Sequence, residues 1–137
     1  MLTAQEDQDN GCIINTCVQV ASDPTKLAIS VQMGNLTREM IEKSGEFNVS
    51  VLTEDVPFET IRYFGMQSGR DTDKFAGFDH VQRAANGLLF LDKYANAFIS
   101  CKVIEKIDVG THIMFICDVT QCANLNKAET TLKLMKN

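Results

Sequence analysis

Polar side chains interrupt an apolar stretch near the start of the chain, at Asn15, Thr16 and Gln19. Isoleucine, valine and cysteine surround them, with Cys17 in the middle of the group. Amides and hydroxyls that become buried need hydrogen-bond partners. Those partners could be neighbouring backbone groups or the polar edge of a bound ligand, and the residue pattern leaves both interpretations open.

An anion-binding site is predicted where a strand gives way to a helix, over residues 32–38. Asn35 is a favourable N-cap, and the backbone N–H groups of Asn35, Leu36 and Thr37 lie at the positive end of the helix dipole. Thr37 adds a hydroxyl, and Arg38 adds a cation. This set suits a phosphate monoester, while the alternative is an ordinary capped helix.

Two further regions carry side chains that could do chemistry. The polar loop 68–75 contains Arg70 and Lys74, which could bind an anionic ligand or simply face solvent. His112 follows a predicted turn and starts the last predicted strand, where a lone histidine is more often structural than catalytic. The sequence contains no GxSxG, HExxH or P-loop motif, so no common catalytic signature directs the interpretation.

Composition disfavours several classes of protein. With 137 residues and a net charge of −5, the chain fits one domain whose acidic surface repels nucleic acid. No apolar run reaches the roughly 18–20 residues of a membrane span, and no signal peptide is visible. Two histidines, and five cysteines without a CxxC pair, disfavour a metal site or a disulfide framework. Free thiols in a reducing cytoplasm are therefore expected.

The spacing of apolar residues predicts a mainly β protein with inserted helices. The predicted strands are Cys12–Val20, Leu27–Gln32, Phe47–Leu52, Leu88–Leu91, Ala95–Ile107 and Thr111–Cys122, and the predicted helices are Leu36–Ser44 and Asp55–Phe64. Strand 47–52 alternates, so we expect it to be half-buried with Asn48 and Ser50 on its polar face. A long polar loop at 67–86 and a peripheral tail from Lys127 complete the chain. These elements predict a small antiparallel β-barrel with helices at its ends or sides.

The last predicted strand has a continuous apolar centre, Ile113–Cys117. Such a run predicts burial on both faces of the strand, by the core on one side and by another subunit on the other. A chain of this size also builds only a small core by itself. We therefore expect a homodimer.

The order and spacing of several segments resemble the flavin reductase-like family, whose members are FMN-binding split β-barrels of Greek-key-like antiparallel strands. More narrowly, the chain is similar to the branch found in anaerobes, as free-standing flavin reductases or fused to rubredoxin-type electron carriers. The similarity extends from about Leu2 to about Asn124. The matching segments are Gly11–Pro24, Asn35–Thr37, Glu39–Gly45, Phe47–Leu52, Ser68–Asp71, Asp73–Phe75, Gly110–His112 and Ile116–Val119.

The resemblance implies a flavin-dependent oxidoreductase. FMN, or alternatively FAD, would accept hydride from NADH or NADPH and pass electrons to free flavin, a ferric chelate, oxygen or a carrier protein. The alternative is an FMN-binding electron-transfer module that docks a redox partner such as rubredoxin and has no NAD(P)H turnover of its own.

The resemblance also implies roles for individual residues. The strand Asn15, Thr16, Cys17 and the following Gln19 would lie along the isoalloxazine ring, and Gln32, Asn35, Leu36 and Thr37 would hold the phosphate. Arg70 would approach the flavin or the substrate, and His112 would lie at the reactive face, where the nicotinamide stacks.

The chain departs from the family pattern at two places. Met33 stands where related chains often carry lysine or arginine, and the loss of that charge would weaken phosphate affinity unless Arg38 compensates. Related chains also begin with a further helix and a complete first strand. We therefore expect residues 1–137 to form a single flavin reductase-like domain that lacks the N-terminal helix and most of the first strand.

Overall fold

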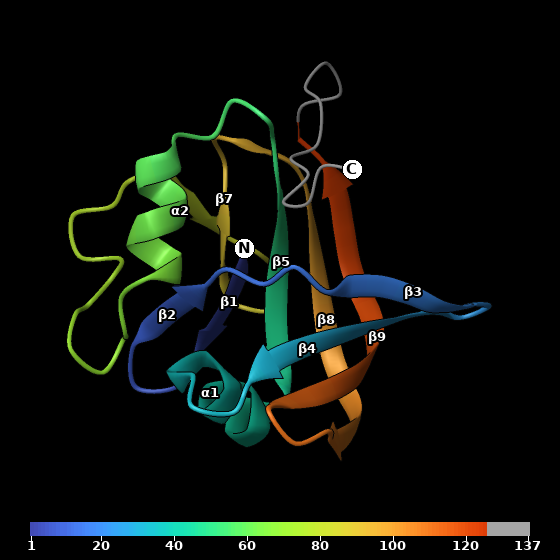
Figure 1. Ribbon diagram of the computed structural model, residues 1–137. Helices are drawn as coiled ribbons and strands as arrows, with labels where there is room; N and C mark the ends of the chain where they lie inside the picture. The colour runs from blue at the N-terminus through green and yellow to red at the C-terminus, as the bar shows by residue number, and fades with distance from the viewer. Residues whose placement is uncertain (126–137) are drawn as a thin grey trace.

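A seven-stranded antiparallel sheet forms the body of the protein in this computed structural model, which describes residues 1–125 (Figure 1). In sheet order the strands are β2 (Asp9–Cys12), β1 (Leu2–Gln5), β5 (Glu46–Leu52), β8 (Ala95–Asp108), β9 (His112–Asn124), β4 (Thr25–Gln32) and β3 (Cys17–Ser22). A separate two-stranded ribbon pairs β6 (Val81–Arg83) with β7 (Leu89–Leu91). The two helices are α1 (Leu36–Ser44) and α2 (Phe58–Gly65). The sequence prediction of a mainly β protein with inserted helices is confirmed.

Helix α1 closes one end of the curved sheet. It lies below β1 and β2 in Figure 1 and contacts β1, β2 and β4, which belong to opposite halves of the sheet. Asn35 caps its start by accepting a hydrogen bond from the Thr37 N–H at 2.8 Å. Gly45 ends it in the left-handed conformation, with φ of 75°. The predicted bounds of this helix are those observed, and its buried side chains join the larger core against Ile29, Phe47 and Phe115.

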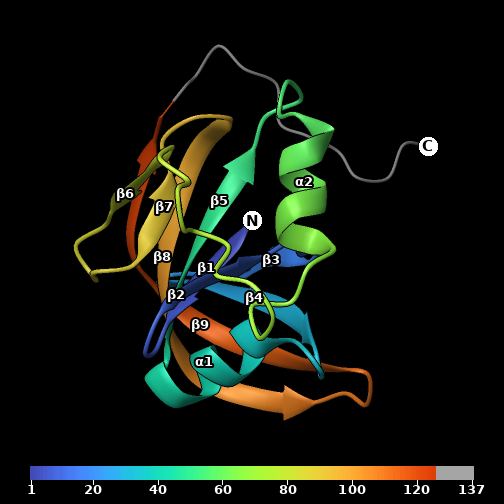
Figure 2. The same ribbon diagram turned by 90° about the vertical axis from the view of Figure 1, so that its left-hand side faces the viewer.

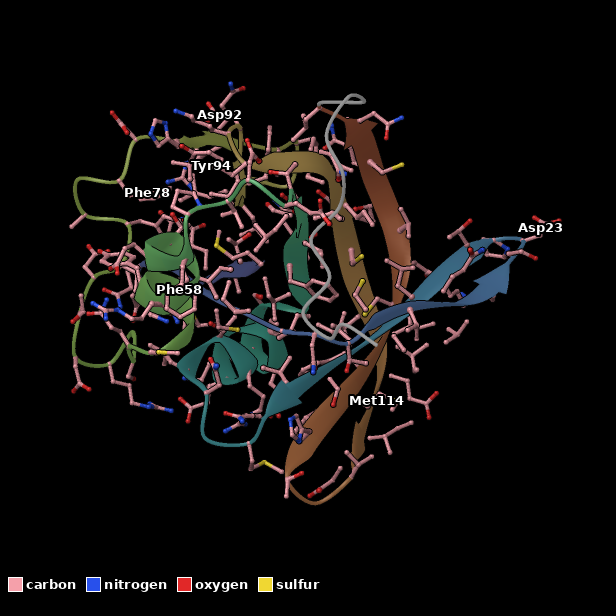
Figure 3. The ribbon with its side chains drawn as sticks, turned by 45° about the horizontal axis from the view of Figure 1, so that its top comes forward. Asp23, Phe58, Phe78, Asp92, Tyr94 and Met114 are labelled. Atoms are coloured by element: carbon pink, nitrogen blue, oxygen red, sulfur yellow. The ribbon has the colours of Figure 1, made fainter. Side chains whose placement is uncertain are left out.

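Helix α2 covers a second, smaller core. Phe64 is fully buried there, and its ring centroid lies 5.1 Å from Phe75 and 5.2 Å from Phe78. Figure 2 shows α2 and the β6–β7 ribbon on either side of β5. Pro57 is the N-cap residue, so the helix begins three residues later than Asp55, the predicted start. Phe58 is 63 % exposed and lies on the outside of α2 (Figure 3), not on its buried face.

Strands β3 and β4 leave the body together as an arm that ends near Asp23 (Figures 1 and 3). The predicted strand Cys12–Val20 is wrong in its continuity, because β2 ends at Cys12 and β3 begins at Cys17. The two strands pair with different neighbours, β1 and β4, at opposite edges of the sheet. Residues 13–16 must therefore cross from one edge to the other, and they cannot belong to either ladder.

Strand β5 is not half-buried, as the alternation predicted. Asn48 and Ser50, the residues of its polar face, are fully buried. The Asn48 amide donates to the carbonyls of Leu88 and Leu89 and accepts from the Ser100 hydroxyl at 2.6 Å. The β6–β7 region thus covers this face through hydrogen bonds. The predicted loop 67–86 also contains strand β6, while the predicted tail from Lys127 lies outside the described residues.

Candidate functional site

A pocket of about 370 Å³ lies between the β2–β3 crossing, the edge of β4 and the adjoining ends of both helices. Its lining combines amides, a hydroxyl and an imidazole with aliphatic side chains. The lining residues are Cys12, Ile13, Ile14, Asn15, Ser30, Val31, Gln32, Asn35, Gly65 and His112. Four residues predicted from the sequence therefore meet around one cavity: Asn15, Gln32, Asn35 and His112.

The edge of β4 forms one wall of this pocket. Strand β3 pairs with β4 only as far as the Cys17–Ile29 pair, so the edge from Ser30 to Gln32 continues without a strand partner. An unpaired strand edge presents backbone donors and acceptors to a ligand. His112 starts β9 directly opposite Gln32, which places the imidazole at the same end of the wall. Its Nδ1 lies 2.8 Å from the Thr111 hydroxyl.

The start of α1 forms the polar end of the pocket, and its own residues already use much of its hydrogen-bonding capacity. The Asn35 N–H donates to the Gln32 carbonyl at 3.1 Å, and the Thr37 N–H donates to the Asn35 carboxamide. The Thr37 side chain is fully buried and accepts a 2.9 Å hydrogen bond from the Asn10 amide. The structure thus shows Thr37 beneath the pocket and Asn35 at its surface.

The cations near this helix start are engaged elsewhere. Arg38 donates to the Met33 carbonyl at 2.8 Å and pairs with Glu42 at 3.0 Å. Arg70 pairs with Glu39 at 2.6 Å, and this hydrogen bond lowers the pKa of the Glu39 carboxyl. Among the described residues that line the pocket, none is lysine or arginine. The charge missing at Met33 is therefore not replaced by Arg38 in this arrangement.

Several predicted residues do not line the pocket. Cys17 is half-buried and packs against the larger core, as does Leu36. The Thr16 hydroxyl donates to the Asn15 carboxamide. Gln19 is exposed on the arm, where its amide donates to the Ala21 carbonyl.

Sequence reasoning missed other lining residues, above all Cys12. Its thiol is buried, and burial raises its pKa, although hydrogen bonding to Thr37 and the nearby charge of Lys74 oppose that rise. Ile13, directly after β2, lies against Gly65 at the end of α2, so closely that a Cβ on Gly65 would lie 3.2 Å from the Ile13 side chain. A local sequence pattern cannot predict a contact between residues 52 positions apart. Of the sequence observations, only the match of segment Gly11–Pro24 to the family indicated this part of the pocket.

The pocket fits a flavin in size and chemistry. Its volume lies within the roughly 300–1,000 Å³ typical of small-molecule sites. Ile13, Ile14 and Val31 offer apolar contact to a flat ring, while the β4 edge and Asn15 offer donors and acceptors to its polar edge. The helix start at Asn35 is the feature nearest in chemistry to a phosphate site.

The fold and this pocket define the class of the protein: a split β-barrel with a ligand pocket at the open strand edge. The particular family follows from its sequence. The family model of the flavin reductase like domain matches residues 1–136, so the chain belongs to that family. The resemblance predicted from the sequence segments is confirmed.

Two relatives place the chain within the family. It is 38 % identical over 130 residues to high molecular weight rubredoxin of Moorella thermoacetica, covering 94 % of this chain and 56 % of that protein. It is 34 % identical over 119 residues to the ferric-chelate reductase (NAD(P)H) of Archaeoglobus fulgidus, covering 87 % of this chain and 70 % of the relative. The chain thus spans little more than half of the first relative.

Solved structures confirm the split-barrel fold. The FMN-binding protein of Thermus thermophilus superimposes with a TM-score of 0.81 at 21 % identity, over 90 % of this chain and 67 % of that one. The styrene monooxygenase flavin reductase of Pseudomonas putida S12 gives a TM-score of 0.75 at 26 % identity, over 90 % and 78 %. The predicted fold class is therefore correct.

Two other features bear on function. Within residues 1–125, no helix is long and apolar enough to cross a membrane. In the same part of the chain, no group of three histidine, cysteine or acidic side chains is arranged to hold a metal ion.

Proposed function

We propose that the protein is an NAD(P)H-dependent flavin reductase that binds FMN, with FAD as the alternative, in the pocket at the edge of β4. One observation carries the proposal: in a chain of the flavin reductase family, Asn15, Gln32, Asn35 and His112 surround one cavity of suitable size. The ferric-chelate reductase relative, named for its use of NAD(P)H, supports the choice of reductant.

The bound flavin would supply the redox chemistry, by taking a hydride from NAD(P)H and giving electrons to an acceptor. The chain's own residues bind, orient and shield it. Asn15 and the free edge of β4 hold the polar side of the ring, and Ile13 and Ile14 cover an apolar part. Asn35 meets the phosphate at the helix start, while Arg70, released from Glu39, is the loop cation able to join it. His112, which lines the same pocket, would orient the nicotinamide.

The test compares the two histidines of the chain. Purified protein is reconstituted with FMN, and oxidation of NADH and NADPH is followed without oxygen. We expect His112→Ala to lower the rate of flavin reduction about tenfold, the equivalent of one contact worth ~1.4 kcal/mol, with FMN affinity unchanged. His80→Ala, which alters a residue of the loop before β6, should leave the rate unchanged. Absence of FMN binding by the unaltered protein would refute the proposal.

A second candidate function is an electron-transfer module that takes electrons from, or gives them to, a rubredoxin-type partner. The relative called high molecular weight rubredoxin favours it. FMN binding without NAD(P)H oxidation, together with rapid electron exchange with added rubredoxin, would select this candidate over the first.

We further propose that the protein is a cytoplasmic homodimer. Free cysteines at all five positions suit a reducing compartment. Half-buried Met114 and Ile116 lie on the outer face of β9, where Met114 is opposite the exposed Ile107 of β8. The exposed Val18 of β3 lies in the same row as Ile116, with Ala28 of β4 between them. Such an apolar face supports a subunit contact.

A further inference from the structure

Lys74 is a buried cation without a carboxylate partner, directly behind the wall of the pocket. The residue is 2 % exposed. Its ammonium group donates to the Gly11 carbonyl at 2.8 Å and to the Phe64 carbonyl at 2.7 Å. Among the described residues, no Asp or Glu pairs with it, and Cys12 is the ionisable group that opposes the effect of burial on its pKa.

The two carbonyls connect Lys74 to the pocket from both sides. Gly11 precedes Cys12 at the end of β2, and Phe64 precedes Gly65 at the end of α2. Cys12 and Gly65 both line the pocket. The ammonium group therefore lies one residue behind the lining at two places, and its hydrogen bonds hold those two parts of the wall together.

Two acceptors and a helix end offset part of the cost of burying this charge. Both acceptors are carbonyl oxygens, and the Phe64 carbonyl belongs to the last turn of α2, where the helix dipole is negative. Burial nevertheless lowers the pKa of Lys74 from its ordinary value, against the smaller opposing effect of Cys12. The rings of Phe64, Phe75 and Phe78 pack against one another, which holds the backbone beside Lys74 in place.

We propose that Lys74 is the cation that sets the reduction potential of the bound flavin, acting as a positioning residue through the wall at Cys12 and Gly65. Two-electron reduction adds negative charge to the ring unless two protons accompany the electrons. A fixed positive charge in a low-dielectric wall stabilises that added charge more than it stabilises the neutral ring. With Lys74 charged, the protein thus binds reduced FMN more tightly than oxidised FMN. This inference rests on the proposed binding of flavin in the pocket.

The experiment removes the charge in two ways and compares each variant with a matched surface variant. Lys74→Met keeps an unbranched side chain without donors, and Lys74→Gln keeps two N–H donors for the carbonyls without the charge. Lys43→Met removes the same unit charge from an exposed lysine on α1, whose partner is Glu6. The midpoint potential of bound FMN, the affinity for oxidised FMN and the thermal unfolding of flavin-free protein are measured for each.

We expect both Lys74 variants to bind reduced FMN about tenfold more weakly relative to oxidised FMN. For a two-electron couple this is a fall of about 30 mV in the midpoint potential. Lys43→Met should change the ratio less than twofold. In the unaltered protein, bound FMN should have a higher midpoint potential than free FMN in the same buffer, a measurement that needs no variant.

Two outcomes would overturn the inference. One is an unchanged midpoint potential in either folded Lys74 variant, even with lower thermal stability, since Lys74 would then be only a brace between β2 and α2. The other is a midpoint potential in the unaltered protein that is equal to or below that of free FMN. Failure of the unaltered protein to bind FMN would instead refute the proposed function, so the two failures are distinguishable.

Discussion

Asn35 caps the start of α1 and is also the residue that we propose to meet the phosphate. Its carboxamide accepts the Thr37 N–H, which stabilises the helix, and it also faces the pocket end where a phosphate would lie. Aspartate caps a helix about as well as asparagine but adds a negative charge. A substitution at this residue can therefore separate capping from phosphate binding.

We predict that Asn35→Asp weakens FMN binding about tenfold or more, because a carboxylate repels the phosphate dianion across a contact worth ~1.5–3 kcal/mol. Riboflavin has the same ring without the phosphate, so its affinity should be unchanged. Titration of both ligands by fluorescence quenching checks this. Equal losses for both ligands would place the phosphate elsewhere, and the helix start would then be a cap only.

A second residue-scale prediction concerns pH and the core thiols. Burial raises the pKa of Cys117 from its ordinary value of 9.0 to about 12. The unfolded chain therefore loses this proton near pH 9, while the folded protein keeps it until about pH 12. The thiol's contribution is fully present below pH 9, and the free energy of unfolding falls as pH rises through this window, by up to ~1.4 kcal/mol per pH unit.

Replacing this thiol should remove its share of the pH dependence. Urea unfolding in reducing buffer at several values between pH 8 and pH 11 should show a shallower decline for Cys117→Ala than for the unaltered protein. Cys122 is exposed at the far end of β9, and Cys122→Ala should leave the decline as it was. A slope that Cys117→Ala does not change would contradict the expected titration.

At the scale of elements, the C-terminal end of α1 depends on the left-handed conformation of Gly45. Gly45 adopts φ of 75°, a conformation that costs other residues energy, and no atom lies within 4 Å of a Cβ built there. Gly45→Ala should therefore lower the free energy of unfolding by about 1 kcal/mol through the backbone alone. Gly34 also has open space around it but no positive φ, so Gly34→Ala is the matched control and should be close to neutral. Thermal unfolding of both variants measures the difference.

Helix α1 could be predicted in full because its signals are local: Asn35 at its start, apolar residues at helical spacing, and Gly45 at its end. Strand β5 could be located but its burial could not. Asn48 and Ser50 are covered by residues near Leu88, which lie 40 positions along the chain. Alternation reports which side chains share a face, and it does not report whether another segment covers the polar one.

The same limit explains what was missed at the site. Asn15, Gln32, Asn35 and His112 could be proposed because the family resemblance extends over their segments. Arg70 pairs with Glu39, which is 31 positions away in the chain. Lys74 donates to the Gly11 carbonyl, which is 63 positions away. Charged residues in a polar loop predicted solvent or ligand contact, whereas Lys74 is buried and donates to the Phe64 carbonyl of α2.

At the scale of the whole molecule, one sheet face lacks a covering element in the described chain. Inner residues of β9, such as Phe115, are buried in the core, while Met114 and Ile116 alternate with them on the outer face. Met114 is opposite Ser30 on β4 and Ile107 on β8. Figure 3 places Met114 beside these strands, away from both α2 and its exposed Phe58. The continuous apolar run Ile113–Cys117 therefore contains alternating residues, some buried in the core and the others on the outer face of the sheet.

We predict that this outer face joins two copies of the chain. Light scattering should give twice the 15.2 kDa chain mass at micromolar concentration. Met114→Lys introduces a charge that a dimer would bury without a partner, which costs several kcal/mol, and should yield monomers. Phe58→Lys makes the same change at the 63 % exposed residue of α2, and the dimer should persist. If the unaltered protein has the mass of one chain, the apolar face has another role.

Because His112 and Gln32 end the same two strands, dissociation should also weaken FMN binding, while Phe58→Lys should leave it unchanged.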